Sequence, residues 1–146
     1  MLLAQLANAV MQRQDGGGAI VNVSSVSGHR PSPGTAAYGA AKAGLDNLTG
    51  SLAVEWAPKV RVNSVICGMV RTELAHVHYG DDDGIAAVGR TVPLGRLARP
   101  SEIGNCVAFL ASPLASYVTG GVLVAHGGGE APAFLAAATA NSKGNQ

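Results

Sequence analysis

Apolar side chains occupy most positions of the stretch Ala19–Ile20–Val21–Asn22–Val23–Ser24. A strand of this kind is typical of a parallel sheet in which helices cover both faces. The segment Asp15–Gly16–Gly17–Gly18 precedes it and ends a helix that we expect over residues 1–14. Residues 26–36 follow it and are rich in proline and glycine, which indicates a loop.

Helices and strands alternate along the next part of the chain. A long helix is expected over residues 37–57, where leucines recur at roughly helical spacing, and Pro58 ends it. Further strands are expected over residues 60–66 and 121–125. This order predicts an α/β fold in which three parallel strands are joined by right-handed crossovers that contain the flanking helices.

The segment between the last two strands is expected to be mostly loop. Within residues 67–100, the run Asp81–Asp82–Asp83 is interpreted as a solvated turn, because it lacks the spaced oxygen ligands of a calcium loop. A helix is expected over residues 100–111, with Ser101 as its N-cap.

Tyr38 and Lys42 form the first chemical motif, because residues four apart share one face of a helix. A lysine ammonium in that position stabilises a phenolate, so the tyrosine can exchange a proton with a substrate hydroxyl or carbonyl near neutral pH. Ser25 closes the first strand thirteen residues upstream and can offer its hydroxyl to the same oxygen. Alternation along the strand puts Ser24 on the opposite side, which favours Ser25 as the second donor.

These residues, in this order, resemble the C-terminal part of a classical short-chain dehydrogenase/reductase, whose signature is a serine at a strand end followed by Tyr-x-x-x-Lys. The resemblance covers residues 1–130 and rests on matching motifs in the family's order: Gly18–Ala19–Ile20–Val21–Asn22–Val23–Ser24–Ser25, Arg61–Val62–Asn63–Ser64–Val65–Ile66–Cys67–Gly68–Met69–Val70–Arg71–Thr72, Pro93–Leu94–Gly95–Arg96, Pro100–Ser101–Glu102–Ile103 and Val118–Thr119–Gly120–Gly121. It implies that the three strands are the last of seven in a doubly wound, Rossmann-type sheet.

The resemblance also implies roles for individual residues. Tyr38 would be the general acid and base, Lys42 would tune it and bind the nicotinamide ribose, and Ser25 would orient the substrate oxygen. Cofactor contacts would come from the loop after the second strand, through Gly68, the backbone of Val70 and the hydroxyl of Thr72.

The loop departs from the family pattern in one position, since Cys67 stands where the family usually has proline. A second departure is His126, before the glycines of the last motif, where the family more often has aspartate. We interpret His126 as a structural or interface residue. The implied reaction is the NAD- or NADP-dependent interconversion of a small-molecule alcohol and ketone.

The family's Gly-rich pyrophosphate turn, which lies between a strand and a helix, has no counterpart in this sequence. Gly16–Gly17–Gly18 follows a helix and precedes a strand, which is the wrong order. We therefore expect residues 1–130 to be the C-terminal part of one domain and residues 131–146 to be a tail whose last six residues are disordered. The strand at 19–24 would then have an open edge.

Composition restricts the class of protein. A net charge of +1 without a basic stripe argues against nucleic acid as a partner, and the apolar runs are too short to span a bilayer. Cys67 and Cys106 show neither metal-ligand nor disulfide spacing, which favours reduced thiols in a cytoplasmic protein. His76 and His78 are interpreted as loop residues or substrate contacts, and no metal site is predicted because a third ligand is missing.

Three hypotheses follow for the chain. It is an oxidoreductase of this type, or a truncated, inactive relative that pairs with full-length subunits, or the product of a broken reading frame. The family builds tetramers or dimers through helices corresponding to residues 1–14 and 37–57 and through the last strand. The isolated chain of 146 residues is expected to be inactive.

Overall fold

The computed structural model describes residues 1–139 and contains one parallel sheet with the strand order β1-β2-β3. Its strands are β1 (Gly18–Ser25), β2 (Val60–Cys67) and β3 (Val122–Ala125). The prediction of a three-stranded parallel α/β fold is confirmed, and each strand matches its expected range to within one residue at each end. The prediction for residues 141–146 falls outside the described residues.

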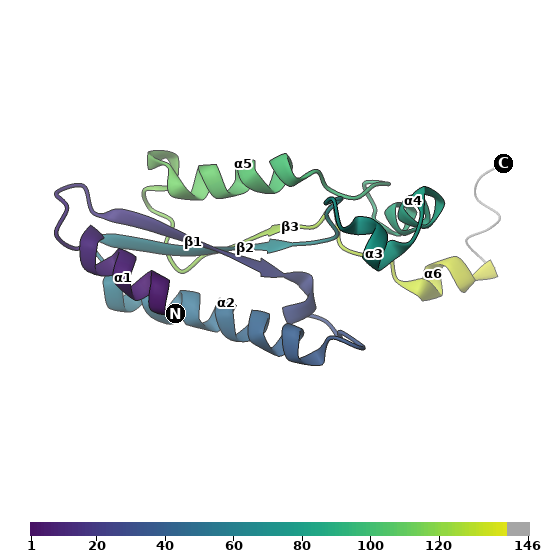
Figure 1. Cartoon of the computed structure of the whole chain (residues 1–146), viewed down its shortest axis with the longest axis horizontal. Helices are drawn as coiled ribbons and strands as arrows, with labels where there is room; N and C mark the ends of the chain where they lie inside the picture. The colour runs from purple at the N-terminus through teal and green to yellow at the C-terminus, as the bar shows by residue number, and fades with distance from the viewer. Residues whose placement is uncertain (140–146) are drawn as a thin grey trace.

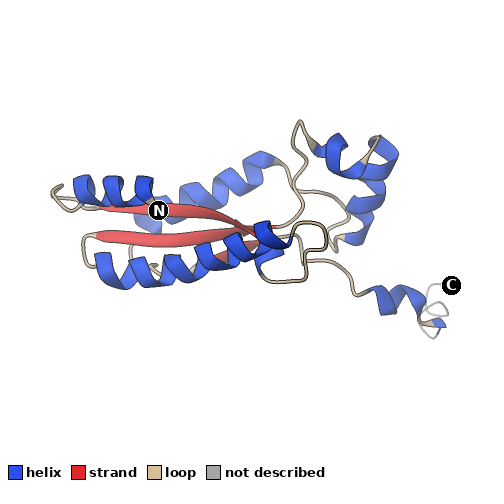
Figure 2. Cartoon of the chain, turned by 60° about the horizontal axis from the view of Figure 1, so that its bottom comes forward, coloured by secondary structure: helices blue, strands red, loops and turns tan. Residues whose placement is uncertain are grey.

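Helices cover both faces of the sheet (Figure 1). On one face lie α1 (Leu2–Met11) and α2 (Ala36–Trp56), and on the other lies α5 (Pro100–Ala111). Figure 2 shows the same layers from another side, with the short C-terminal helix extending away from the sheet. The remaining short helices are η1 (Val26–Gly28), α3 (Ala75–Tyr79), α4 (Asp82–Thr91), η2 (Pro113–Ala115) and α6 (Ala133–Ala137).

The main core lies between α2 and the central strand β2. Leu52, Ala53 and Trp56 from α2 pack with Val60 and Val62 from β2, and all are almost completely buried. β2 is buried along nearly its whole length, as expected for a strand with helices on both faces. Fully burying an aliphatic side chain contributes about 1.5–3 kcal/mol, so this contact is a main source of the fold's stability.

β1 lies at the edge of the sheet, because it pairs only with β2 among the described strands. Val23 on this strand is 48% exposed. The predicted open edge is therefore present in the part of the chain that the structure describes. No helix there is both long and apolar enough to cross a membrane.

The structure corrects the sequence prediction in the segment 67–100. Two helices, α3 and α4, occupy much of what was expected to be loop. The run Asp81–Asp82–Asp83 begins α4, and the Asp81 side chain caps it by accepting a hydrogen bond from the Gly84 N–H at 3.0 Å. Acidic residues are favourable at this end of a helix, because its first N–H groups lack partners.

The prediction that Ser101 caps α5 is wrong. Arg99 is the N-cap, and its N–H donates to the Glu102 carboxylate at 2.7 Å. Pro100 takes the first helical position, where its missing N–H has no cost, so the N-cap lies two residues upstream of the predicted serine. α1 likewise ends at Met11 and not at residue 14, since the chain leaves it through turns before Gly17.

Candidate functional site

The carboxyl ends of the three strands meet at one edge of the sheet. Ser25 ends β1 in register with Cys67 of β2, and Cys67 is in register with Ala125 of β3. In open parallel sheets, ligands bind outside this edge. Ser25, the loop after Cys67 and the segment after Ala125 therefore surround one candidate site.

Tyr38 and Lys42 lie on one face of α2, as their spacing predicts. The Lys42 Nζ atom is 5.5 Å from the centre of the Tyr38 ring. Tyr38 is 48% exposed, so a ligand can reach its hydroxyl. Lys42 Nζ also donates a hydrogen bond to the Val23 carbonyl oxygen at 2.8 Å, which brings α2 to the end of β1.

Ser25 is half-buried at the end of β1, and its Oγ accepts a hydrogen bond from the Ser27 N–H at 3.2 Å. A hydroxyl can accept and donate at once, so the Ser25 hydrogen remains free to donate to a ligand oxygen. The loop η1 follows directly and packs closely on α2. A Cβ at Gly28 would lie 2.7 Å from the Ala43 nitrogen, and one at Gly39 would lie 2.6 Å from the Ser27 oxygen, so both positions depend on glycine.

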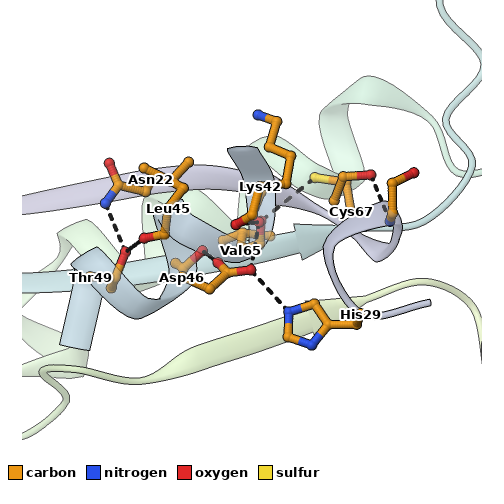
Figure 3. Close-up of polar contacts among 12 residues, drawn as sticks. Asn22, His29, Lys42, Leu45, Asp46, Thr49, Val65 and Cys67 are labelled. Carbon is orange, nitrogen blue, oxygen red and sulfur yellow. Dashed lines mark hydrogen bonds and ion pairs between the residues drawn. The ribbon is translucent and has the colours of Figure 1, made fainter. Parts of the chain in front are cut away.

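A buried carboxylate lies one turn beyond Lys42 (Figure 3). Asp46 accepts hydrogen bonds from Ser24 at 2.7 Å, from Ser64 at 2.6 Å and from the His29 Nε2 at 2.9 Å. Burial raises the pKa of Asp46, but these bonds and the charge of His29 outweigh it and leave the pKa below its ordinary value. Sequence reasoning missed this cluster, although Asp46 lies four residues after Lys42, on the same face of α2.

The loop after β2 contains the three residues expected to contact a cofactor. A Cβ at Gly68 would lie 2.7 Å from the His126 Cα, so glycine allows the two strand ends to approach. Val70 forms a parallel β-bridge with Ala98. In this bridge the Ala98 N–H donates to the Met69 oxygen, and the Arg71 N–H donates to the Ala98 oxygen. Among residues 1–139, neither the Val70 N–H nor the Thr72 hydroxyl has a hydrogen-bond partner, so both donors are available.

A cavity of about 280 Å³ opens at the same edge of the sheet. Arg30 and Glu130 form an ion pair at 2.6 Å beside it and link the loop after β1 to the segment after β3. The sequence predicted neither this cavity nor the ion pair. The residues that line the cavity are Val26, His29, Arg30, Gly68, Met69, His126, Gly129 and Glu130.

Other residues considered from the sequence lie apart from this cavity's lining. His76 and His78 are in α3, and the His76 Nδ1 atom forms a hydrogen bond with the Glu73 carbonyl oxygen at 2.9 Å. No group of three or more metal-ligating side chains occurs among residues 1–139. Burial raises the pKa of the Cys67 thiol, partly offset by the charge of Lys42, so it is a weak nucleophile.

A larger hollow of about 580 Å³ lies along α4 and contains none of the predicted site residues. Arginines line it, but Arg71 is paired with Asp82 at 3.1 Å, and Arg96 and Arg99 are paired with Glu102 at 2.7 and 3.4 Å. Arg90 also lines it, so these two carboxylates offset only part of its positive charge. Because this hollow contains none of the predicted site residues, we place the candidate site at the sheet edge.

Comparison with known proteins finds similar sequences and a similar fold. A family model described as enoyl-(acyl carrier protein) reductase matches residues 1–130. An uncharacterized short-chain type dehydrogenase/reductase of Sinorhizobium fredii, y4vI, is 49% identical over 77% of this chain and 21% of its own length. Cis-4-hydroxycyclohexanecarboxylate dehydrogenase of Sinomonas cyclohexanicum is 46% identical over 77% of this chain and 45% of its own.

A solved structure has the same fold. The aldohexose dehydrogenase of Thermoplasma acidophilum, in ligand-free form, superposes with a TM-score of 0.79 at 34% identity, over 86% of this chain and 52% of its own. The chain thus spans at most about half the length of these relatives.

Proposed function

The chain belongs to the short-chain dehydrogenase/reductase family, whose members are oxidoreductases that generally use NAD or NADP, and from this membership we propose that it provides the proton-transfer site of such an enzyme. The reaction would be the interconversion of a small-molecule alcohol and ketone. The observation that carries the proposal is the Tyr38–Lys42 pair at 5.5 Å, beside the strand end that carries Ser25.

Tyr38 would transfer the proton. In reduction its hydroxyl donates a proton to the carbonyl oxygen as the carbon gains a hydride, and in oxidation the phenolate takes the proton back. The Lys42 ammonium stabilises this phenolate from the same helical face. The Ser25 hydroxyl donates to the same substrate oxygen and fixes its direction, since its only described contact uses a lone pair and not its hydrogen.

The loop residues fit a nicotinamide cofactor. The unpaired Val70 N–H and Thr72 hydroxyl support this assignment, because they are donors without protein partners at the carboxyl edge of the sheet. NAD or NADP, when bound, supplies or accepts the hydride. Gly68 keeps the loop close to the end of β3, and Tyr38 and Lys42 would also contact the cofactor.

The names of the relatives support a hydroxyl-bearing substrate of small size. One is named for a hydroxycyclohexane carboxylate and another for an aldohexose. The cavity of about 280 Å³, which is lined by Val26 next to Ser25, is slightly smaller than the usual range of about 300–1,000 Å³ for small-ligand sites. We propose that the alcohol or ketone binds there.

A second candidate function is supported by the surface of α1. No residue of this helix is buried, and Leu2, Leu3 and Leu6 are 70%, 82% and 58% exposed. Apolar side chains gathered on one helix favour a subunit interface. A homo-oligomer, or pairing with full-length relatives, is therefore part of the proposal, and an inactive pairing partner is the alternative to the enzyme.

The test uses a reconstituted enzyme, in which the N-terminal half of a full-length relative is joined before Met1. It is assayed with NAD, NADP and two probe alcohols, cis-4-hydroxycyclohexanecarboxylate and glucose. Tyr38→Phe should lower kcat by at least about 100-fold and leave cofactor affinity nearly unchanged. Tyr117→Phe, at a fully exposed tyrosine, is the control and should keep full activity. More than about a tenth of the activity in Tyr38→Phe would refute the acid–base assignment.

A further inference from the structure

Asp46 is a buried carboxylate that the proposed reaction does not use. Its side chain is only 8% exposed, whereas that of its partner His29 is 51% exposed. The partners come from three other parts of the fold: Ser24 from β1, Ser64 from β2 and His29 from the segment after η1. One carboxylate therefore joins α2 to both strands and to the loop that follows Ser25 (Figure 3).

The cluster does not have the arrangement of a hydrolase. In a serine hydrolase the serine hydroxyl donates to the histidine, which in turn donates to the carboxylate. Here both serine hydroxyls donate to Asp46 directly, and among residues 1–139 the His29 ring makes no bond to a hydroxyl. The carboxylate is therefore interpreted as a structural group that holds its hydrogen-bond partners in place.

The contacts of Ser24 show which residues the Asp46 carboxylate holds in place. Its hydroxyl donates to Asp46 Oδ2 at 2.7 Å and also lies 3.3 Å from the Lys42 carbonyl oxygen. Ser24 directly precedes Ser25, and Asp46 lies one helical turn after Lys42. The cluster therefore fixes the turn of α2 that carries Lys42 against the strand end that carries Ser25.

We propose that Asp46 is a positioning residue, which holds Lys42 and Ser25 at their working separation through Ser24, with Ser64 and His29 as its other anchors. The inference deepens the proposed function and rests on it for its catalytic meaning. The contacts themselves can be tested without any activity.

The negative charge is needed because all three partners act as donors. A carboxylate accepts at both oxygens, with room for about four bonds, and hydrogen bonds to an ionised group are stronger than neutral ones. An asparagine at this position would have to turn its amide group toward either Ser64 or the pair formed by Ser24 and His29. The partners that face the amide nitrogen would lose Asp46 as their acceptor, and a serine hydroxyl there would have to accept instead of donate.

The experiment measures the reactivity of two lysines in the chain as it stands. Lys42 Nζ donates to the Val23 oxygen at 2.8 Å, and Lys59 Nζ donates to the Gln14 oxygen at 3.0 Å, far from Asp46 in the sequence. Trace acetylation followed by peptide mass spectrometry reports how often each amine leaves its partner. Lys59 is thus an internal control for general loosening of the fold.

In Asp46→Asn, labelling of Lys42 should rise about tenfold, which corresponds to the loss of a hydrogen bond to a charged group, while labelling of Lys59 stays constant. Ser24→Ala keeps the charge and should produce the same change, which covers the case in which Asp46→Asn fails to fold. Ser64→Ala removes only the anchor on β2 and should affect Lys42 less. Far-ultraviolet circular dichroism confirms that each variant is folded.

Equal labelling of Lys42 in the wild-type chain and in Ser24→Ala, or a parallel rise at Lys42 and Lys59, would overturn the proposal. In the reconstituted enzyme, Asp46→Asn should lower kcat with little change in KM, and Asp46→Glu should recover part of the loss. Absence of activity in the wild-type reconstituted enzyme would refute the proposed function, whereas the labelling result would still decide the role of Asp46.

Discussion

Replacing Gly28 by alanine tests whether the loop after Ser25 is held against α2 as closely as the structure shows. The new Cβ would lie 2.7 Å from the Ala43 nitrogen, 3.0 Å from the Lys42 carbonyl carbon and 3.2 Å from the Ala43 Cα. All three neighbours are backbone atoms of a helix, so they cannot turn aside as the tip of a side chain would. The loop itself must move, and Ser25 moves with it.

The magnitude follows from two opposing effects. Inserting a methyl group into a tightly packed contact costs about 1–3 kcal/mol. Alanine also reduces the conformational entropy of the unfolded chain, which offsets about 0.4–1 kcal/mol of this loss of stability. We therefore expect Gly28→Ala to lower the free energy of unfolding by about 1–2 kcal/mol.

Gly44→Ala is the matched control, because a Cβ there meets nothing within 4 Å and the residue lies inside α2. This change should stabilise the chain by up to about 1 kcal/mol, since alanine favours a helix over glycine. Urea unfolding of both variants, followed by circular dichroism, measures the two free energies. If Gly28→Ala proved as stable as Gly44→Ala, the close contact between η1 and α2 would be wrong.

Three further predictions concern the cofactor and pH. Lys42→Ala in the reconstituted enzyme should shift the rise of the oxidation rate to higher pH, because the phenolate loses its nearest cation, and should weaken cofactor binding; an unchanged profile with unchanged affinity would remove Lys42 from the mechanism. The chain of 146 residues alone should bind NADH and NADPH more weakly than micromolar and show no dehydrogenase activity, because it has no Gly-rich turn between a strand and a helix; calorimetric titration decides this. The hydrogen bond from Arg96, with that from the Arg99 N–H, lowers the pKa of Glu102 from 4.5 to about 2. Its contribution to stability should be complete above pH 4.5 and lost as the pH falls toward 2, so the melting temperatures of wild type and Glu102→Gln should converge over that range.

The sheet could be predicted from the sequence because its signals are local. The run at residues 19–24 is apolar at most positions, and the strand at 60–66 lies between Pro58 and the glycine at 68. Both strands formed with the expected bounds to within one residue. The helix α4 has a local signal, the acidic run at its start, which was interpreted as a solvated turn. The helix α3 was missed because it is only five residues long and Ala75 packs against Ile85 and Leu97 from later in the chain.

The candidate site could be predicted only where its residues are neighbours on one element. Tyr38 and Lys42 share a face of α2, so their spacing alone brings them together. The roles assigned to them, to Ser25 and to the loop residues stay predictions. Asp46 was missed because Ser24, Ser64 and His29 approach it from separate elements, and no sequence pattern specifies that meeting.

The hydrogen bond from Lys42 to Val23 lies at the open edge of β1. In a parallel sheet, alternate residues direct their backbone groups to one side, and the Gly18 N–H donates to the Lys59 oxygen on the side of β2. Residues an odd number of positions further along, Val23 among them, therefore point to the open edge. The Lys42 ammonium is bound to the Val23 carbonyl at that edge. A strand that pairs there would compete with Lys42 for this carbonyl. Pairing at this edge and the hydrogen bond of Lys42 are therefore coupled, because both use the same carbonyl oxygen.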